Sequence, residues 1–379
     1  MKRFRHIALL AVLWAAFLSS CGGRQKVEVP DTSGYAAYAQ CFDLLPEGEG
    51  WAIVSLSPYD GTTDTLHVTE PLQKIVCMST SHVGFLDAIG AADAVVAVSG
   101  CDFVSSQRIR ERIAEGLVAE AGYDAAPAYE TLYQLHPDVV LSYSLGGASP
   151  MDERLTELGI RVFTLYEHLE SHPLARAEYV RLFGALTGRM DVADSLFAVV
   201  SSGYLSRAVD LSSETVVLED RPARSPDLSS ERAVFRDSPQ KVLVNLPYAG
   251  VWYIPGAESY MARLIRDAGG EVLGAEPGTS QSGMISLEKA YELACEADFW
   301  LNAGNVQSLD ELRRENAAFA SFPVAAPGRV YTNSRRAQTG GGNDFWESGA
   351  VRPDLILKDL RTIFAGGPED SLYYYQSVK

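Results

Sequence analysis

Hydrophobic positions from residue 74 onward form short β-branched runs that alternate with segments of helical periodicity. The runs at 75–78, 94–98, 139–142 and 162–165 predict buried strands, and the segments at 79–89, 105–113, 128–135 and 151–158 predict helices. Such alternation is typical of a mostly parallel sheet with helices on its faces. The pattern therefore predicts an N-terminal α/β lobe over residues 71–172.

The same alternation returns in the second half of the chain. Strands are predicted at 216–218, 242–245, 299–301 and 330–331, and helices at 259–268, 286–295, 309–314 and 351–364. The second half therefore predicts a C-terminal α/β lobe over residues 213–366. A loosely packed tail is expected over residues 367–379.

Between the two halves, residues 173–212 keep apolar side chains at helical spacing. Only Gly188 and Arg189 interrupt this pattern, which predicts a helical connector that includes the interdomain helix. The predicted fold class is therefore α/β, with two Rossmann-like lobes joined by one long interdomain helix and a ligand cleft between the lobes.

The first 70 residues predict secretion, a spacer and a small extension. Residues 1–20 have a basic start, an apolar run at 7–17 and a small-residue cleavage site before Cys21, which indicates a lipoprotein signal peptide. Acyl chains on Cys21 would anchor an extracytoplasmic protein to the membrane, on its periplasmic side or at the cell surface. Residues 21–50 lack periodicity and predict a flexible tether. Residues 51–70 predict a β-hairpin extension.

The net charge of the chain narrows the classes of molecule that it could bind. The chain of 379 residues has a net charge of −17, and removal of residues 1–20 leaves 29 basic and 49 acidic residues. Such a surface disfavours nucleic acid and suits a basic protein partner.

The spacing of the remaining cysteines is not that of a zinc site, so free thiols are the favoured interpretation. These cysteines are Cys41, Cys77, Cys101 and Cys295. The possibility of a disulfide remains, above all between Cys77 and Cys101, because both lie near the ends of predicted strands.

Familiar catalytic motifs are absent from the sequence. It contains no G-x-S-x-G, no P-loop, no H-E-x-x-H and no G-x-G-x-x-G after a strand. His168 and His172 have metal-ligand spacing, but Pro173 follows at once and no third ligand is evident, which favours a solvated loop. We therefore expect no catalytic residues, no metal site and no cofactor.

Loops that follow predicted strands hold the candidate ligand-binding residues, because ligands of open α/β sheets bind at the carboxyl ends of the strands. Aromatic side chains would pack on a flat ligand, and two arginines would meet its anionic groups. Trp252 and Tyr253 stand out because they lie in a predicted loop between two glycines. The full set is Ser81, His82, Asp102, Tyr143, Tyr166, Trp252, Tyr253, Arg335, Arg336 and Trp346.

Several motifs taken together carry a family resemblance over about residues 70–366. They are KIV at 74–76, LDAIG at 86–90, VVAVSG at 95–100, YETL at 129–132, PDVVL at 137–141, LGI at 158–160, LTGR at 186–189, WYIPG at 252–256, DAGG at 267–270 and ADFWL at 297–301. In order and spacing the chain resembles a substrate-binding lipoprotein of an ABC importer, of the class with a rigid interdomain helix. GNDFWESG at 342–349 with RPD at 352–354 resembles a subgroup of that class.

The resemblance implies that the protein captures an iron–siderophore or cobalamin, or haem, and delivers it to an ABC permease and its ATPase. It implies a monomer without enzymatic activity. By motif, Glu130 and Glu288 match the carboxylates that dock on permease arginines, although a carboxylate in a first helical turn also stabilises a helix by ~0.3–1 kcal/mol.

Two other functions stay open at this point. One is a metal-dependent extracytoplasmic enzyme built on histidines, namely His67, His82, His168 or His172. The other is a surface lipoprotein that scavenges its ligand without a transporter.

Overall fold

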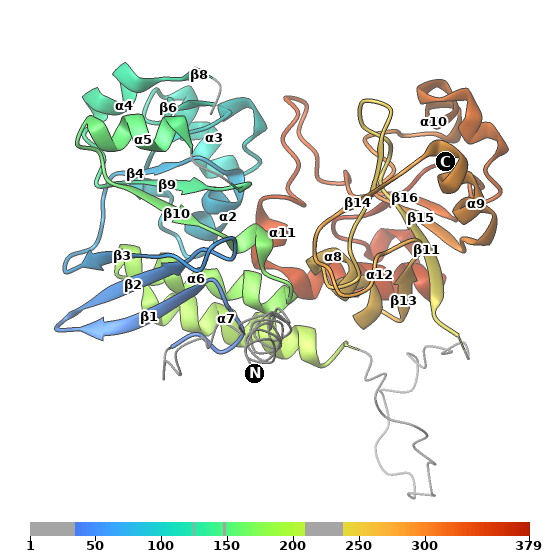
Figure 1. The fold of residues 1–379 in the computed structure, drawn as a ribbon, viewed down its shortest axis with the longest axis horizontal. Helices are drawn as coiled ribbons and strands as arrows, with labels where there is room; N and C mark the ends of the chain where they lie inside the picture. Colours follow the sequence, from blue (N-terminus) through green and yellow to red (C-terminus); the bar gives the residue numbers. More distant parts are fainter. Residues whose placement is uncertain (1–34, 124–125, 147–148, 209–237) are drawn as a thin grey trace, which may run out of the picture. The chain divides into compact units, whose positions relative to one another are not determined.

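The computed structural model describes residues 35–123, 126–146, 149–208 and 238–379 (Figure 1). The predicted signal peptide, the predicted lipidation site at Cys21 and the strand predicted at 216–218 lie outside these ranges. Within them, no helix has the length and apolar character needed to span a bilayer.

The N-terminal lobe is built on a five-stranded parallel sheet with the order β10-β9-β4-β5-β6. Its strands are β4 (Ile75–Cys77), β5 (Val95–Val98), β6 (Ala119–Glu120), β9 (Val139–Tyr143) and β10 (Val162–Leu165). The helices of the lobe are α2 (Thr80–Ala88), α3 (Gln107–Ala114), α4 (Tyr129–Leu135) and α5 (Pro150–Glu157). A two-stranded ribbon joins β7 (Gly122–Tyr123) to β8 (Ala126–Pro127). The alternation predicted from the hydrophobic pattern is confirmed.

The C-terminal lobe has a second five-stranded sheet, with the order β13-β11-β15-β16-β17. Its strands are β11 (Gln240–Val244), β13 (Gly270–Val272), β15 (Phe299–Leu301), β16 (Val330–Thr332) and β17 (Gln376–Ser377), of which only β17 runs antiparallel to its neighbour. The helices are α8 (Tyr260–Asp267), α9 (Leu287–Glu296), α10 (Leu309–Glu315), α11 (Ser348–Val351) and α12 (Pro353–Phe364). A separate antiparallel pair is formed by β12 (Trp252–Ile254) and β14 (Gly283–Ile285). The structure thus has the two α/β lobes that the sequence predicts.

The helical connector consists of two helices, α6 (Pro173–Thr187) and α7 (Met190–Leu205), which pack against each other (Figure 1). Gly188 separates them: its φ of +67° is a left-handed conformation that ends a helix at little cost only for glycine. Helix α7 packs on α12 of the C-terminal lobe, and α6 contacts α8, α11 and α12, so both helices of the connector contact that lobe. The connector thus divides at the Gly188–Arg189 interruption seen in the sequence, and it consists of two helices instead of one long interdomain helix.

Residues 35–50 are folded, so the prediction of a flexible tether over 21–50 is wrong for this part. Strand β1 (Phe42–Glu47) pairs with β2 (Gly50–Leu56), which pairs with β3 (Thr63–Val68) in an antiparallel three-stranded sheet. The predicted hairpin therefore exists and gains one strand. Phe42 and Leu44 point into the core, and the Phe42 ring meets that of Tyr179 at 4.4 Å. Because only Phe42 and Leu44 of this six-residue strand are buried and Leu45 is exposed, the strand has little periodicity to detect.

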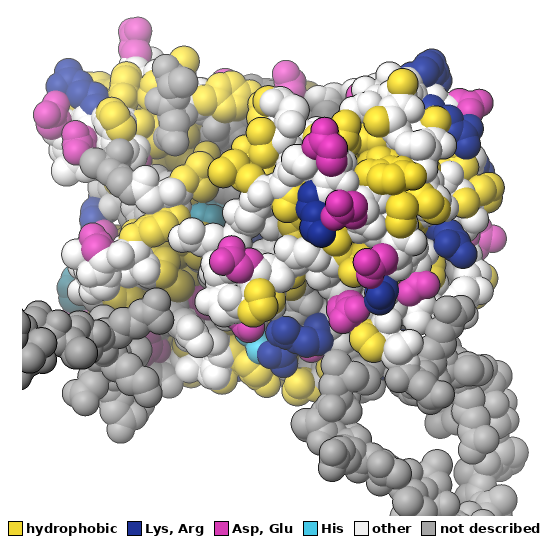
Figure 2. All heavy atoms as spheres, turned by 45° about the vertical axis from the view of Figure 1, so that its right-hand side comes forward, with side chains coloured by type: hydrophobic (Ala, Val, Ile, Leu, Met, Phe, Trp, Pro, Cys, Tyr) yellow, Lys and Arg dark blue, Asp and Glu magenta, His cyan; other side chains and the backbone are white. Residues whose placement is uncertain are grey.

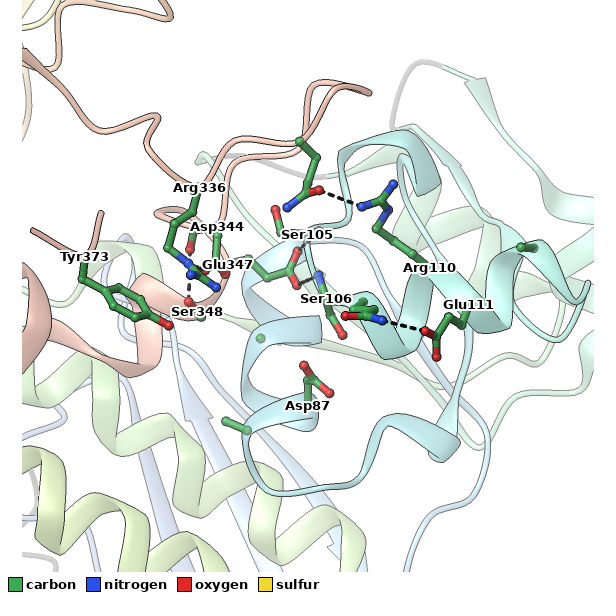
Figure 3. Close-up of a pocket in the computed structure, with 15 residues that line it drawn as sticks. Asp87, Ser105, Ser106, Arg110, Glu111, Arg336, Asp344, Glu347, Ser348 and Tyr373 are labelled. Carbon is green, nitrogen blue, oxygen red and sulfur yellow. Dashed lines mark hydrogen bonds and ion pairs between the residues drawn. The ribbon is translucent and has the colours of Figure 1, made fainter. Parts of the chain in front are cut away.

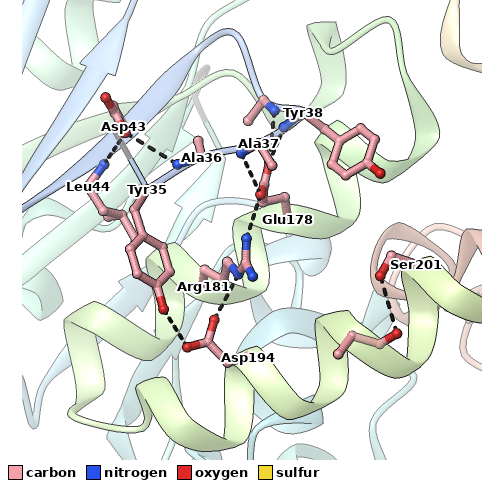
Figure 4. Close-up of polar contacts among 12 residues, drawn as sticks. Tyr35, Ala36, Ala37, Tyr38, Asp43, Leu44, Glu178, Arg181, Asp194 and Ser201 are labelled. Atoms are coloured by element: carbon pink, nitrogen blue, oxygen red, sulfur yellow. Dashed lines mark hydrogen bonds and ion pairs between the residues drawn. The ribbon is translucent and has the colours of Figure 1, made fainter. Parts of the chain in front are cut away.

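Buried carboxylates fix the chain just before β1. Glu178 of α6 accepts hydrogen bonds from the backbone N–H groups of Ala37, Tyr38 and Ala39 at 2.7–2.9 Å (Figure 4). Arg181 donates to the same carboxylate at 2.7 Å, and its charge balances that of Glu178. The backbone N–H groups of residues 37–39 thus have a buried hydrogen-bond partner. These hydrogen bonds hold residues 37–39 on α6 without a hydrophobic core of their own.

The tail is also packed, which contradicts the expectation of a loose segment over 367–379. Tyr374 and Tyr375 are fully buried, and β17 completes the sheet. The Asp359 carboxylate of α12 accepts backbone N–H groups from residues 373–375 at 2.6–3.1 Å.

All four cysteines in the described part of the chain are free thiols. Cys41 and Cys77 are buried, whereas Cys101 is half-buried and Cys295 is exposed. The approach of Cys77 and Cys101 to form a disulfide is therefore not observed.

Candidate functional site

Loops at the carboxyl ends of the two sheets touch each other. A Cβ atom on Gly342, in the loop after β16, would lie 2.6 Å from the carbonyl oxygen of Phe103, which follows β5. Nearby, Arg110 Nη1 of α3 donates to Gln338 Oε1 at 2.7 Å. The two lobes therefore meet at the edge where open α/β sheets bind ligands.

A cavity of about 770 Å³ lies between α2, the start of α3 and the loop before α11 (Figure 3). This volume is within the range of small-molecule sites, which are ~300–1,000 Å³. Its lining is of mixed polarity, and the polar side chains include Asp87, Ser105, Ser106, Arg110, Arg336, Asp344, Glu347 and Tyr373.

Glu347 crosses from the C-terminal lobe to the start of α3. Its carboxylate accepts the backbone N–H groups of Ser105 and Ser106, both at 2.7 Å (Figure 3). Burial raises the pKa of this carboxyl to about 8, and the two N–H donors oppose that rise only in part. Gly84 permits the close contact, since a Cβ there would lie 2.5 Å from the Glu347 carbonyl oxygen. Our sequence reasoning missed this role, although Glu347 belongs to the C-terminal motif.

Arg336 does not offer a free charge to an anionic ligand, contrary to the prediction. Its Nε lies 2.5 Å from Asp344 Oδ2, and its guanidinium stacks 4.4 Å from the Tyr373 ring centroid. Arg335 is exposed and donates to the Glu369 carbonyl at 3.2 Å. The neighbouring Trp346 is also exposed, with 48% of its surface accessible.

Two predicted tyrosines lie side by side on the N-terminal lobe. Tyr143 ends β9, Tyr166 follows β10, and the register pairs Tyr143 with Leu165. Both are half-buried. The Tyr143 ring meets that of His168 at 6.1 Å, and the Tyr166 ring meets that of Tyr59 at 6.3 Å. Tyr59 comes from the hairpin extension, and no pattern in the sequence predicts that this extension lies here.

Ser81 and His82 lie beneath this surface, so the structure contradicts their predicted contact with a ligand. His82 is fully buried, and Ser81 Oγ donates to the buried Glu167 Oε1 at 2.7 Å. His82 Nε2 is 3.7 Å from Glu167 Oε2, and neither ring nitrogen has a hydrogen-bond partner. The first turn of α2 directs both side chains inward. Asp102, in contrast, is exposed.

Trp252 is the clearest correction among the candidate residues. It begins strand β12 and is only 1% exposed; its indole N–H donates to the Val244 carbonyl at 2.9 Å. The ring packs against Trp300 and Phe322, with centroid distances of 5.7 and 6.1 Å. Because side chains alternate along a strand, Tyr253 points the other way and is 38% exposed. Its strand partner Met284 is 71% exposed.

The four candidate metal-binding histidines do not form one cluster. His67 pairs with Glu47 at 2.6 Å, and His172 accepts the Leu174 N–H that begins α6. His82 and His168 lie on either side of Glu167. In the described ranges, no group of three or more His, Cys, Asp and Glu side chains could hold a metal ion.

The two candidate docking carboxylates are both exposed in first helical turns. Glu130 begins α4, and Glu288 begins α9 behind the N-cap Ser286. Hydrogen bonds from its own backbone N–H and from Ser286 lower the pKa of Glu288.

The surface beside Glu288 has an apolar groove of about 600 Å³, which is lined by Tyr291 and Phe322 among other residues. On the face drawn in Figure 2, acidic, basic and hydrophobic side chains are interspersed, and the coloured residues form no continuous basic surface.

Comparison with known proteins relates the chain to lipoproteins. No protein-family model matches it. It is 24% identical over 305 residues to an uncharacterized lipoprotein of Methanocaldococcus jannaschii, a match that covers 78% of this chain and 66% of the relative. A second uncharacterized lipoprotein of the same organism is 24% identical over 388 residues, covering 93% and 90% of the two chains.

Solved structures share the fold. A periplasmic heme-binding protein from Pseudomonas aeruginosa superposes with a TM-score of 0.56 at 17% identity, over 81% of this chain and 98% of that one. An ABC-type Fe3+-hydroxamate transport protein from Saccharomonospora viridis gives a TM-score of 0.54 at 15% identity, over 79% and 96% of the two chains. The two-lobed α/β architecture is therefore that of periplasmic binding proteins.

Proposed function

We propose that this protein is the substrate-binding component of an ABC transporter and that it captures a metal chelate, namely an iron–siderophore, cobalamin or haem. The observation that carries the proposal is the arrangement of two α/β lobes whose carboxyl-end loops meet, with exposed or half-buried aromatic rings on them. Two structural neighbours are described as binding heme or transporting Fe3+-hydroxamate, which supports an iron chelate as the ligand. We include cobalamin because the same aromatic surface would accept a corrin ring.

We further propose an extracytoplasmic monomer that is lipid-anchored through Cys21 and delivers its ligand to a permease and its ATPase. The lipoprotein names of the two relatives and the periplasmic location of the structural neighbours support this placement.

Titration of the purified mature protein with haem, a ferric hydroxamate and cobalamin tests the ligand. Each compound has a visible absorption band that shifts when its surroundings change. We expect saturable one-to-one binding of one of the three, and absence of binding to all three would refute the proposed ligand class.

Reversal of the two docking charges should separate delivery from binding. We expect the double variant Glu130→Lys and Glu288→Lys to bind ligand as the wild type does, because both side chains are exposed and neither is one of the candidate binding residues. It should fail to support uptake in cells, since like charges opposite permease arginines oppose association.

The matched control is Glu115→Lys with Glu315→Lys, which makes the same charge change on exposed helix ends, one in each lobe. Uptake by the control at the wild-type rate is expected. Equal loss of uptake in both double variants would show that net charge, and not the two positions, is responsible.

A further inference from the structure

The turn between β2 and β3 lies beside the carboxyl ends of β9 and β10, on the side of the N-terminal lobe that faces the C-terminal lobe (Figure 1). Strands β2 and β3 pack along β10, which is the edge strand of the parallel sheet. Ser55 Oγ donates to the Thr164 carbonyl at 2.6 Å, and Arg161 Nη2 is 2.7 Å from Asp64 Oδ1. The extension is therefore fixed to this lobe by specific contacts.

The turn itself is also well defined. Ser57 N–H donates to the Thr62 carbonyl at 2.8 Å, and the Asp60 carboxylate accepts from the backbone and hydroxyl of Thr62. Gly61, with φ of +72°, supplies the left-handed residue of the turn. Tyr59, near the tip of this turn, is thus held in place by the backbone on both sides.

Tyr59 reaches the loops that follow two strands of the sheet. Its hydroxyl donates to the Ser144 carbonyl at 3.3 Å, and its ring meets Tyr166 edge to face at 6.3 Å. Gly146 has φ of +98°, and a Cβ at that position would lie 3.3 Å from the Tyr59 ring. The loop after β9 therefore accepts the tyrosine closely, yet 44% of Tyr59 remains exposed.

We propose that the N-terminal extension is part of the ligand site and that Tyr59 is a specificity-determining residue of it. Tyr59 and Tyr166 meet edge to face at the strand ends, and the exposed Leu145 lies in the loop that Tyr59 contacts, so this surface offers apolar groups to a bound metal chelate. This inference rests on the proposed function, because the ligand is the one proposed above.

The test compares Tyr59→Ala, Tyr59→Phe and the control Tyr133→Ala by titration with haem, a ferric hydroxamate and cobalamin. Tyr133 is a tyrosine on α4 whose exposure of 53% is close to the 44% of Tyr59, and its ring meets that of His136. We expect Tyr59→Ala to raise the Kd by about 5-fold to 100-fold, as loss of one stacked ring does. Tyr59→Phe should stay within about 3-fold of the wild type, and Tyr133→Ala should not change the Kd.

Oxidative footprinting of the wild type gives a second measurement that needs no variant. Ligand should protect Tyr59 from modification and leave Tyr133 unprotected. If the wild type binds a probe while Tyr59→Ala binds it equally well and Tyr59 is not protected, the inference fails and the proposed function stands. If the wild type binds none of the probes, both are overturned.

Discussion

Replacement of Trp252 by alanine is expected to lower the free energy of unfolding by about 3–5 kcal/mol, the usual cost of removing a buried aromatic ring. Trp252 is only 1% exposed and packs against Trp300, Phe319 and Phe322. The change also leaves the Val244 carbonyl without its indole donor. Urea unfolding followed by circular dichroism measures the difference.

The adjacent residue provides a matched control. Tyr253 lies on the same short strand but faces outward, so Tyr253→Ala should cost less than about 1 kcal/mol of stability. Ligand affinity should respond in the opposite order, with the larger loss in Tyr253→Ala when both proteins are measured in their folded state. A Trp252→Ala protein as stable as the wild type would show that the ring is not part of the core.

Replacement of Glu347 by glutamine is expected to destabilise the protein by about 1–3 kcal/mol at pH 5.5. At this pH the buried carboxyl is protonated, and both of its oxygens can still accept the N–H groups of Ser105 and Ser106, whereas the amide nitrogen of glutamine accepts neither. The glutamine has the same shape, so the effect reports on hydrogen bonding between the lobes. Glu111→Gln is the control, since Glu111 lines the same cavity but is exposed.

The pH dependence of the Glu347 effect has a definite sign. Burial raises the pKa of this carboxyl from its usual 4.5 to about 8 in the folded protein. A raised pKa means that the folded state binds the proton more tightly, so its stabilising contribution is present below about pH 4.5 and is lost as the pH rises through about 8. The wild type should therefore lose more stability than Glu347→Gln between pH 5.5 and 8.5.

Glu170 acts in the same direction, since burial raises its pKa to about 7. Glu170 is present in both the wild type and Glu347→Gln, so its contribution to the pH dependence cancels when the stabilities of the two proteins are subtracted. A stability difference between wild type and Glu347→Gln that is constant across this pH range would contradict the assignment.

The sequence predicts the position of a candidate site residue only where that residue follows a strand that can be recognised from its own hydrophobic pattern. Tyr143 and Tyr166 follow strands that are recognisable from β-branched runs, and the structure places both at the expected edge. Trp252 was misplaced because its strand exists only through pairing with residues 283–285, about thirty positions away. A three-residue strand leaves too short a pattern to separate it from a loop.

The sequence by itself determined the alternation of strands and helices, the division into two lobes and the helical connector, because periodicity depends on neighbours along the chain. Only the tertiary structure decided which polar groups meet. The carboxylate of Glu347 bonds to Ser105 and Ser106, more than 240 positions earlier, and Glu178 orders a segment about 140 positions before it. Buried donors and acceptors must find partners, but nothing in the local sequence states where those partners lie. The same holds for Tyr59, which packing on β10 brings to the strand ends.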